Sequence, residues 1–404
     1  MQPPKNFNSH PFNYHQELEL RIDTLTNLGL GLGRVDNWVV MVPFTLPGEL
    51  VKVRVYRNFK NYSDADLIRV IEPSSHRVKP KCDLFGICGG CQYQNFAYSQ
   101  QLLWKQKQIQ DIFQKLAGID ATVNPTIPSP REYFYRSKIT PHFPKPNDTK
   151  EFSIGFLKNN GRNQIVDVPE CPIAMKNVNE SLPAQRNKII SARKKLKKGG
   201  TLLLRATREG VTTDNNAIVS EQVGDLILQF SAGEFFQNNP FILSEMVNYV
   251  VEQAKKDRAR YLIDAYCGVG LFALSAAKSF EKVVGIELNK AAVKSAQNNA
   301  KLNNIENCEF VIGQAENIFG TVLFPSKETV LIIDPPRKGC DQEFIDQLGV
   351  FGPQTIVYIS CEPSTQARDL KLLLALGYHL SAVQPFDLFP QTRHIENIIT
   401  LTKA

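Results

Sequence analysis

The sequence predicts a multidomain α/β protein with an N-terminal OB-like β-barrel, a central α+β domain and a Rossmann-like C-terminal domain. The chain has 404 residues, more than one hydrophobic core usually organises, so several domains are expected. With 43% hydrophobic and 22% charged residues, it has enough apolar material to bury those cores. Short extended segments come first along the chain, and apolar runs alternate with amphipathic helices at its end, which distinguishes the two outer domains.

The chain carries a small excess of positive charge. Its sequence predicts neither a signal peptide nor a membrane-spanning segment. Forty-seven Lys and Arg against 40 Asp and Glu give a formal net charge of +7, which suits a polyanionic partner but is modest for this length. Residues 1–12 are polar, and no run approaches the ~18 apolar residues of a membrane span. Eight cysteines, three of them between residues 82 and 91, favour a metal or cluster over disulfides. We expect a monomer in the reducing cytoplasm, without a membrane partner.

After a flexible N-terminus at residues 1–14, residues 15–72 predict a barrel of roughly five strands. Extended segments such as LELRIDTL and ELVKVRVYR are separated by Gly, Pro and polar residues. Cations and aromatic rings are interleaved on them: Arg54, Arg57, Lys60 and Arg69 with Tyr56, Phe59 and Tyr62. These are the two ingredients of sequence-tolerant RNA binding. The pattern leaves open both an RNA-binding barrel and a purely structural one.

Residues 73–235 predict a central α+β domain that begins with the crowded cysteines. Apolar residues at helical spacing predict a helix over about residues 99–116: Leu102, Ile109, Ile112, Phe113 and Leu116. Strand-like segments such as FSIGFL and TLLLRAT follow. The basic run from Arg193 to Lys198 is either a solvated helix face or a contact to phosphates.

Residues 236–404 predict a doubly wound sheet whose first strand ends in a turn suited to a nucleoside cofactor. This turn contains Gly268 and Gly270, which let a ligand approach the backbone closely. The second strand ends in Glu287, where a carboxylate can accept hydrogen bonds from both ribose hydroxyls. Ala273 replaces the third glycine of a dinucleotide fingerprint, which favours S-adenosylmethionine over a nicotinamide cofactor. A tight turn in an unrelated α/β domain is the alternative.

Polar groups follow the later strands of this domain. An acid, Asp334, opens the segment DPPR, and Cys361 follows the next strand. Glu396 precedes the final apolar strand and could return to the same edge. C5 of uracil is a poor nucleophile, so its methylation needs a thiolate that adds at C6 and a base that removes the C5 proton. Cys361 and Glu396 could supply these groups, although a buried cysteine and a surface acid would show the same pattern.

Together these motifs resemble the RNA uracil-5 methyltransferases of the RumA/TrmA type over essentially the whole chain. The resemblance rests on FFQN from Phe235, DAYCGVGLF from Asp264, DPPRKG from Asp334, SCEPSTQARD from Ser360, HIEN from His394 and the cysteine pattern Cys82-x5-Cys88-x2-Cys91 with the distal Cys171. It implies that Cys361 is the nucleophile and Glu396 the base. It implies a cofactor pocket formed by Gln237, Tyr266, Glu287 and Asp334 beside Gly268 and Gly270. It also implies that the barrel is an RNA-binding TRAM domain.

Four thiolates can hold either tetrahedral zinc or a cubane cluster, and spacing does not decide between them. The resemblance implies a [4Fe-4S] cluster on Cys82, Cys88, Cys91 and Cys171, with a structural or RNA-positioning role and no redox step. Zinc is the alternative. Core packing is expected for the other three cysteines outside the catalytic motif: Cys267, Cys308 and Cys340. Leu271 and Gln314 differ from residues that some members carry in the cofactor pocket.

The sequence therefore predicts methylation of C5 of a specific uridine in structured RNA, with S-adenosylmethionine as the methyl donor and the target nucleotide extruded from its stack. The combination of a TRAM domain and a cluster favours 23S ribosomal RNA by analogy, with transfer RNA as the alternative. A methyltransferase acting on an amino group of a purine or a protein is a rival interpretation and would need no nucleophile. A non-catalytic RNA-binding protein that has kept the fold is another, and the joint presence of Cys361 and Glu396 counts against it.

Overall fold

The computed structural model describes residues 3–146, 152–159, 161–313 and 322–403. The chain forms two compact units. Unit 1 contains Met1–Trp104, Ser153–Val168 and Pro390–Arg393, and unit 2 contains Lys105–Phe152, Pro169–Phe389 and His394–Ala404. Within the described residues, no helix has both the length and the apolar character needed to cross a membrane.

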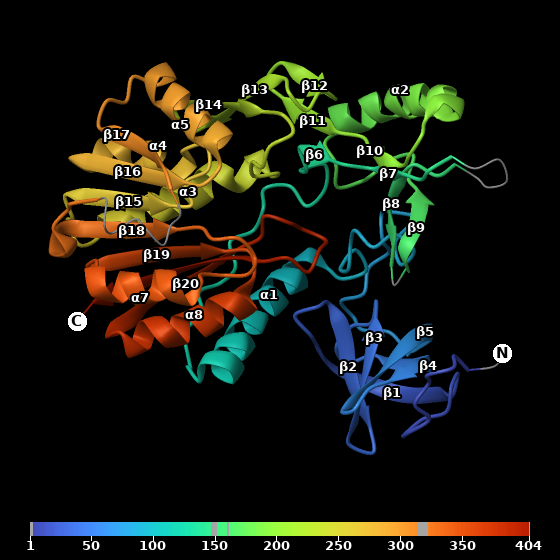
Figure 1. Ribbon diagram of the computed structural model, residues 1–404. Helices are drawn as coiled ribbons and strands as arrows, with labels where there is room; N and C mark the ends of the chain where they lie inside the picture. Colours follow the sequence, from blue (N-terminus) through green and yellow to red (C-terminus); the bar gives the residue numbers. More distant parts are fainter. Residues whose placement is uncertain (1–2, 147–151, 160, 314–321, 404) are drawn as a thin grey trace. The chain divides into compact units, whose positions relative to one another are not determined.

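Unit 1 contains the predicted barrel, which five strands close in the order β1-β2-β3-β5-β4 (Figure 1). The strands are β1 (Glu17–Leu25), β2 (Leu30–Val35), β3 (Trp38–Pro43), β4 (Leu50–Asn58) and β5 (Tyr62–Glu72). Val51, Val53 and Val55 alternate along β4 and are fully buried, as the period of two in a half-buried strand requires. Antiparallel pairing of β1 with β4 completes the barrel, so its strands have no unpaired sheet edge. Unit 1 also contains the hairpin of β8 (Gly155–Lys158) and β9 (Gly161–Asp167).

Three long helices and several short strands precede the large sheet. The helices are α1 (Tyr98–Ile112), which continues in the π-helical turn η1 (Phe113–Ala117), α2 (Lys176–Ala192), followed by η2 (Arg193–Lys195), and α3 (Pro240–Lys255). The strands of unit 2 in this region are β6 (Lys138–Ile139), β7 (His142–Phe143), β10 (Gly200–Thr201), β11 (Leu204–Thr207), β12 (Gly210–Thr212), β13 (Ile218–Val223) and β14 (Leu226–Ser231). The helix predicted over residues 99–116 is confirmed by α1 and η1.

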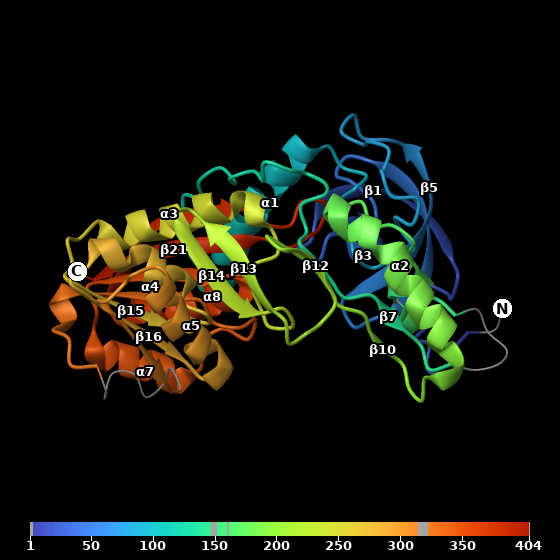
Figure 2. The same cartoon turned by 90° about the horizontal axis from the view of Figure 1, so that it is seen from above.

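The large sheet of unit 2 has seven strands in the order β17-β16-β15-β18-β19-β21-β20. The strands are β15 (Tyr261–Ala265), β16 (Lys282–Glu287), β17 (Cys308–Ile312), β18 (Thr329–Ile333), β19 (Thr355–Ser360), β20 (Tyr378–Phe386) and β21 (Glu396–Lys403). The helices between them are α4 (Leu271–Ala276), η3 (Ala277–Ser279), α5 (Lys290–Leu302), η5 (Ser326–Glu328), α7 (Gln342–Phe351) and α8 (Pro363–Ala375). Figures 1 and 2 show helices on both faces of the sheet, as predicted for a doubly wound fold.

The strand residues alternate between two cores. Leu262, Val330 and Val357 pack with apolar residues of α3, α4 and α5. Ile263 and Leu331, their neighbours in the chain, pack with α7 and α8 on the other face. Because both faces are covered, the central strands are apolar throughout, which is the pattern of a parallel sheet buried on two sides.

The last strand departs from the parallel arrangement that the alternation predicted. β15, β16, β17, β18 and β19 pair in parallel, whereas β21 runs antiparallel to both β19 and β20. Nine residues connect β20 to β21, fewer than the dozen or more that a parallel crossover requires. The first residues of β21 therefore lie at the edge of the sheet where β19 ends, and Asn397 pairs with Ser360.

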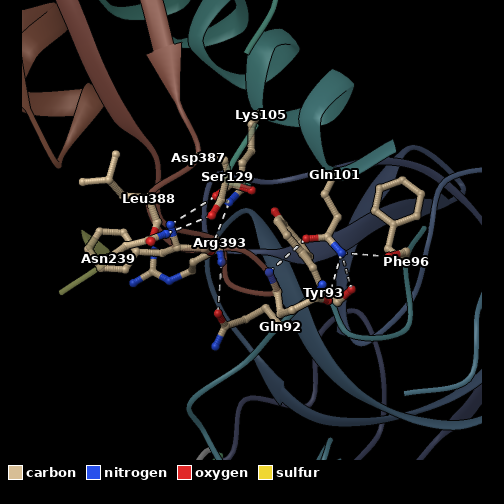
Figure 3. Close-up of polar contacts among 12 residues, drawn as sticks. Gln92, Tyr93, Phe96, Gln101, Lys105, Ser129, Asn239, Asp387, Leu388 and Arg393 are labelled. Atoms are coloured by element: carbon tan, nitrogen blue, oxygen red, sulfur yellow. Dashed lines mark hydrogen bonds and ion pairs between the residues drawn. The ribbon is translucent and has the colours of Figure 1, made fainter. Parts of the chain in front are cut away.

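The connection between β20 and β21 begins with buried polar contacts in unit 2 (Figure 3). The ammonium group of Lys105 lies 2.6 Å from Asp387 Oδ1, and neither side chain is exposed. Lys105 Nζ also donates to the carbonyl of Phe389. Asn239 Nδ2 donates to Leu388 O and Ser129 Oγ, each at 3.0 Å. These contacts fix the backbone that leads to β21.

Removal of one member of the buried pair is expected to leave the other charge buried without a partner. We predict that Asp387→Ala lowers the free energy of unfolding of unit 2 by about 3–5 kcal/mol. The double variant Lys105→Met with Asp387→Leu is expected to recover most of that loss, because it removes both charges. Urea denaturation of the three proteins, followed by circular dichroism, measures the difference. A wild-type midpoint for Asp387→Ala would show that the pair contributes little.

Candidate active site

The two glycines that the sequence analysis singled out lie in the turn after β15, and both adopt positive φ values. Gly268 and Gly270 have φ values of 55° and 91°, and Tyr266 also has a positive φ of 67°. A Cβ on Gly268 would meet open space, whereas one on Gly270 would lie 3.0 Å from Leu274. Gly268 thus leaves room beside the backbone for a ligand, and Gly270 is needed for close packing against α4.

A buried carboxyl group holds this turn from within the fold. Asp264, near the end of β15, is fully buried, and its Oδ2 accepts a hydrogen bond of 2.8 Å from the amide of Ala273. Its Oδ1 has no hydrogen-bond partner among the described residues. Burial raises the pKa of Asp264 well above its ordinary value, and the nearby charges of Asp334 and Glu287 raise it further.

Glu287 lies beside the same turn, at the end of the neighbouring strand β16. Its Oε2 accepts from the amide of Gly268 at 3.2 Å, and its Oε1 accepts from Asn289 at 2.8 Å. Each carboxylate oxygen has a further lone pair, so both remain able to accept from ribose hydroxyls. Gln237 lies in the segment between β14 and α3 and is 9% exposed.

The residues of this turn fit S-adenosylmethionine. The open space at Gly268 admits a ligand close to the backbone, and Glu287 places a carboxylate at the adjacent strand end. The unpartnered Oδ1 of Asp264 offers a further acceptor. Glu287 suits an adenosine group, because its carboxylate can accept hydrogen bonds from the ribose hydroxyls.

Two further predicted residues lie beyond strands β18 and β19. Asp334 follows β18 directly, and Cys361 follows β19. Because these strands are parallel neighbours, both side chains belong to the same edge of the sheet. Glu396 begins β21 and is 2% exposed. The antiparallel pairing of Ser360 with Asn397 places Glu396 at this edge as well.

The electrostatics show that these groups interact. Burial raises the pKa of Cys361 to about 11, and the charges of Glu396 and Asp334 raise it as well. Arg337 lowers it, both by its charge and by a hydrogen bond to the thiol. Burial also raises the pKa of Asp334 to about 7. For Glu396, burial and then Asp334 raise the pKa well above its ordinary value, and Arg337 opposes them.

The first turns of α8 hold the loop that carries Arg337. Arg368 donates to the carbonyls of Lys338 at 3.0 Å and Cys340 at 2.9 Å. Asp369 is fully buried and accepts from the Cys340 amide at 2.9 Å and from the Tyr358 hydroxyl at 2.7 Å. The loop between β18 and α7 is therefore fixed to the same helix that follows Cys361.

Arg337 is a site residue for which the sequence analysis predicted no role. Its position directly after Asp334-Pro335-Pro336 was a usable signal, because a guanidinium beside a predicted thiolate would stabilise the charged form. The residue Gln314, for which the sequence suggested a difference in the cofactor pocket, lies outside the described residues. Leu271 is buried at the start of α4.

The cysteines predicted to bind a cluster are distributed over both units. Cys82, Cys88 and Cys91 lie in unit 1 and Cys171 in unit 2, and all four are partly buried. Among the described residues, no three His, Cys, Asp or Glu side chains come together in an arrangement that could hold a metal ion. The cluster therefore stays a prediction from the sequence. Cys267 and Cys340 are buried in the two cores, and Cys308 packs against the first of them.

Comparisons with known proteins agree with the predicted family and fold. A profile of the family described as tRNA (Uracil-5-)-methyltransferase matches residues 201–404, and a TRAM domain profile matches residues 14–68. A tRNA (uracil(54)-C(5))-methyltransferase of Schizosaccharomyces pombe is 44% identical over 98% of this chain and 80% of its own length. One from Saccharomyces cerevisiae is 34% identical over 96% of this chain and 74% of its own length.

A solved structure shares the fold over most of the chain. The crystal structure of Pyrococcus abyssi tRNA (uracil-54, C5)-methyltransferase in complex with S-adenosyl-L-homocysteine matches with a TM-score of 0.74 at 24% identity, covering 95% of this chain and 100% of that one. The fold and the turn at Gly268 define an S-adenosylmethionine-dependent methyltransferase with an N-terminal TRAM barrel. The chain belongs to the tRNA (uracil-5-)-methyltransferase family, and it is an RNA uracil-5 methyltransferase. The family predicted from the motifs is thus confirmed.

The reactivity of Cys361 toward iodoacetamide tests the electrostatics of the site. We predict slow alkylation at pH 7 that increases toward pH 10, because burial raises the pKa of the thiol to about 11. Glu396→Gln removes a neighbouring negative charge and should speed alkylation, most strongly at high pH, where Glu396 is ionised. Arg337→Gln removes a positive charge and should slow it, by about tenfold for each unit of pKa. Mass spectrometry of the peptide that contains Cys361 measures the rate.

The exposed acid Glu343 on α7 provides a matched control. Glu343→Gln removes one negative charge from the same unit and should leave the alkylation profile unchanged. If Glu396→Gln and Arg337→Gln shifted the profile in the same direction, the assignment of opposite electrostatic effects would be wrong.

Proposed function

We propose that the chain methylates C5 of uridine 54 of transfer RNA through a covalent adduct on Cys361, with Glu396 as the base. The observation that carries the mechanism is the pairing of Ser360 with Asn397, which brings the neighbouring Cys361 and Glu396 to one edge of the sheet, where Arg337 lowers the pKa of the Cys361 thiol. The choice of substrate rests on the two fungal relatives, both of which are tRNA (uracil(54)-C(5))-methyltransferases. These relatives favour transfer RNA over the ribosomal RNA that the sequence analysis favoured.

The proposed reaction begins with the thiol of Cys361. It loses its proton to solvent, and Arg337 stabilises the resulting thiolate by its positive charge. The sulfur then forms a bond to C6 of the uracil, and the electron pair of the C5–C6 double bond moves onto C5 and O4. C5 becomes nucleophilic in this adduct, which the free uracil ring does not achieve. S-adenosylmethionine, when bound, supplies the methyl group.

Glu396 completes the proposed reaction. After C5 has acquired the methyl group, the carboxylate of Glu396 removes the C5 proton, the C5–C6 double bond re-forms, and the bond between C6 and sulfur breaks. The raised pKa of Glu396 makes its carboxylate a stronger base than an exposed glutamate. Burial in the sheet also keeps this carboxylate away from bulk water, so it can take the proton from C5 of the substrate.

The four predicted cofactor contacts are part of the proposal. Glu287 would bind the ribose hydroxyls, and Tyr266, Gln237 and Asp334 would contact the rest of the cofactor. Asp334 is partly buried and lies beside Cys361. This position supports a contact with both the cofactor and the uracil ring. Gly268 supports the proposal by the free space beside its backbone.

The test uses unmodified transfer RNA and ribosomal RNA in separate pools with S-adenosylmethionine, followed by mass spectrometry of the nucleosides. We expect 5-methyluridine in the transfer RNA pool only, and a loss of at least about 10³-fold for Cys361→Ala, because the adduct cannot form. Glu396→Gln should instead accumulate a protein–RNA adduct that survives denaturing electrophoresis. Product from Cys361→Ala would overturn the covalent mechanism, and product in the ribosomal pool alone would overturn the substrate.

We also propose that Cys82, Cys88, Cys91 and Cys171 bind a [4Fe-4S] cluster, with zinc as the alternative. This proposal rests on the pattern of the four cysteines in the sequence. Protein purified without oxygen should contain iron and sulfide in about equal amounts, and Cys91→Ala should lose both. Cys308→Ala serves as the control and should retain them. Stoichiometric zinc without iron would establish the alternative, and the absence of both metals would contradict the site.

A further inference from the structure

The positive charge of the chain is concentrated in one segment of unit 2. Residues 181–208 contain nine Lys and Arg and no Asp or Glu. The whole chain has 47 Lys and Arg and 40 Asp and Glu, so the remaining residues hold 38 basic against 40 acidic side chains. The excess of +7 is therefore local, and the rest of the molecule is slightly acidic.

Five lysines of this segment are exposed and form what we call the basic surface: Lys188, Lys194, Lys195, Lys197 and Lys198. They lie at the end of α2, in η2 and in the residues before β10. None of the five forms an ion pair with another described residue. By contrast, exposed lysines elsewhere do so, including Lys107 with Asp111 and Lys255 with Glu252. The charges of the basic surface are thus available to an external anion.

An open hollow of about 510 Å³ lies along the exposed face of α2. It is lined by Ala184, Asn187, Lys188, Ser191, Ala192 and Lys195. The first five are spaced by three and four residues, which places them on one side of α2, and Lys195 follows in η2. The opposite side contains the buried Val178 and Leu182. Small side chains in the hollow allow a ligand backbone to come close, while two lysines provide charges for phosphate groups.

We propose that the basic surface binds the phosphate backbone of the RNA substrate away from the nucleotide that is methylated. This proposal rests on the proposed function, because it takes transfer RNA as the substrate. Figures 1 and 2 both show α2 apart from the seven-stranded sheet of unit 2, whose strand ends carry Cys361 and Glu396, so an RNA that reaches the basic surface must extend beyond the nucleotide in the active site. Lysine suits this task, since it binds phosphates as a point charge without reading sequence.

The experiment compares two variants that lose the same charge. The first carries Lys194, Lys195, Lys197 and Lys198 changed to Gln. The control carries the same change at four exposed lysines elsewhere in unit 2: Lys256, Lys301, Lys327 and Lys371. Both lower the formal net charge from +7 to +3. Binding of unmodified transfer RNA is measured at several salt concentrations, together with KM and kcat for methylation.

The basic-surface variant should bind transfer RNA at least about tenfold more weakly at low salt, and the slope of log K against log[salt] should become shallower by about one for each phosphate group that the variant no longer neutralises. Its KM for RNA should rise while kcat at saturating RNA stays within about twofold of the wild-type value. The control should retain the wild-type slope and KM. Circular dichroism and calorimetric binding of S-adenosylmethionine verify that both variants are folded.

Equal changes in both variants would overturn the proposal, because they would show an effect of net charge alone. An unchanged slope in the basic-surface variant would also overturn it. So would poly-glutamate that binds to this surface without displacing transfer RNA. A wild-type protein that binds transfer RNA through these lysines but does not methylate it would support the surface and reject the proposed substrate. The two failures are therefore distinguishable.

Discussion

Glu396 can lie beside Cys361 only because β21 runs against β19. If the last strand were parallel to its neighbours, its first residue would lie at the opposite edge of the sheet, roughly 17–20 Å away. The nine-residue connection from β20 excludes that arrangement. The ion pair of Lys105 with Asp387 and the amide of Asn239 hold the start of this connection. The position of the last acid thus depends on buried polar contacts made outside the site.

A second dependence links the Cys361 thiol and the Arg337 guanidinium through α8. The helix begins two residues after Cys361, and its Arg368 and Asp369 bind the loop that carries Arg337. One rigid element therefore sets both the thiol and the charge that stabilises its ionised form. Arg337 is exposed and Cys361 is only partly buried, so solvent screens this charge in part. A small displacement of α8 would change the ionisation of Cys361 without altering any residue at the site.

The sequence predicted the sheet, the barrel and the turn at Gly268 because each depends on a local pattern: apolar periodicity, strand-breaking residues or glycine spacing. It also indicated that Asp334 and Cys361 share an edge, since parallel strands end on the same side. It did not predict the direction of β21, because an apolar strand has the same pattern in either direction. The sequence also did not predict the buried pair of Lys105 and Asp387, because the two residues are far apart in the chain and no local pattern links them. The hydrogen bond of Arg337 to the thiol likewise depends on how the loop is held.

The distribution of charge reconciles an acidic active site with a polyanionic substrate. Asp264, Glu287, Asp334 and Glu396 lie at the strand ends, and four ionised carboxylates there would repel a phosphate backbone. Burial raises the pKa values of Asp264, Asp334 and Glu396, so these groups carry less negative charge near neutral pH than exposed acids would. The chain outside residues 181–208 has no net positive charge, so the basic surface proposed above would supply much of the attraction for the RNA backbone. In the proposed arrangement, the attractive charges are separate from the carboxyl groups at the strand ends, so RNA binding would leave the proton affinity of Glu396 unchanged.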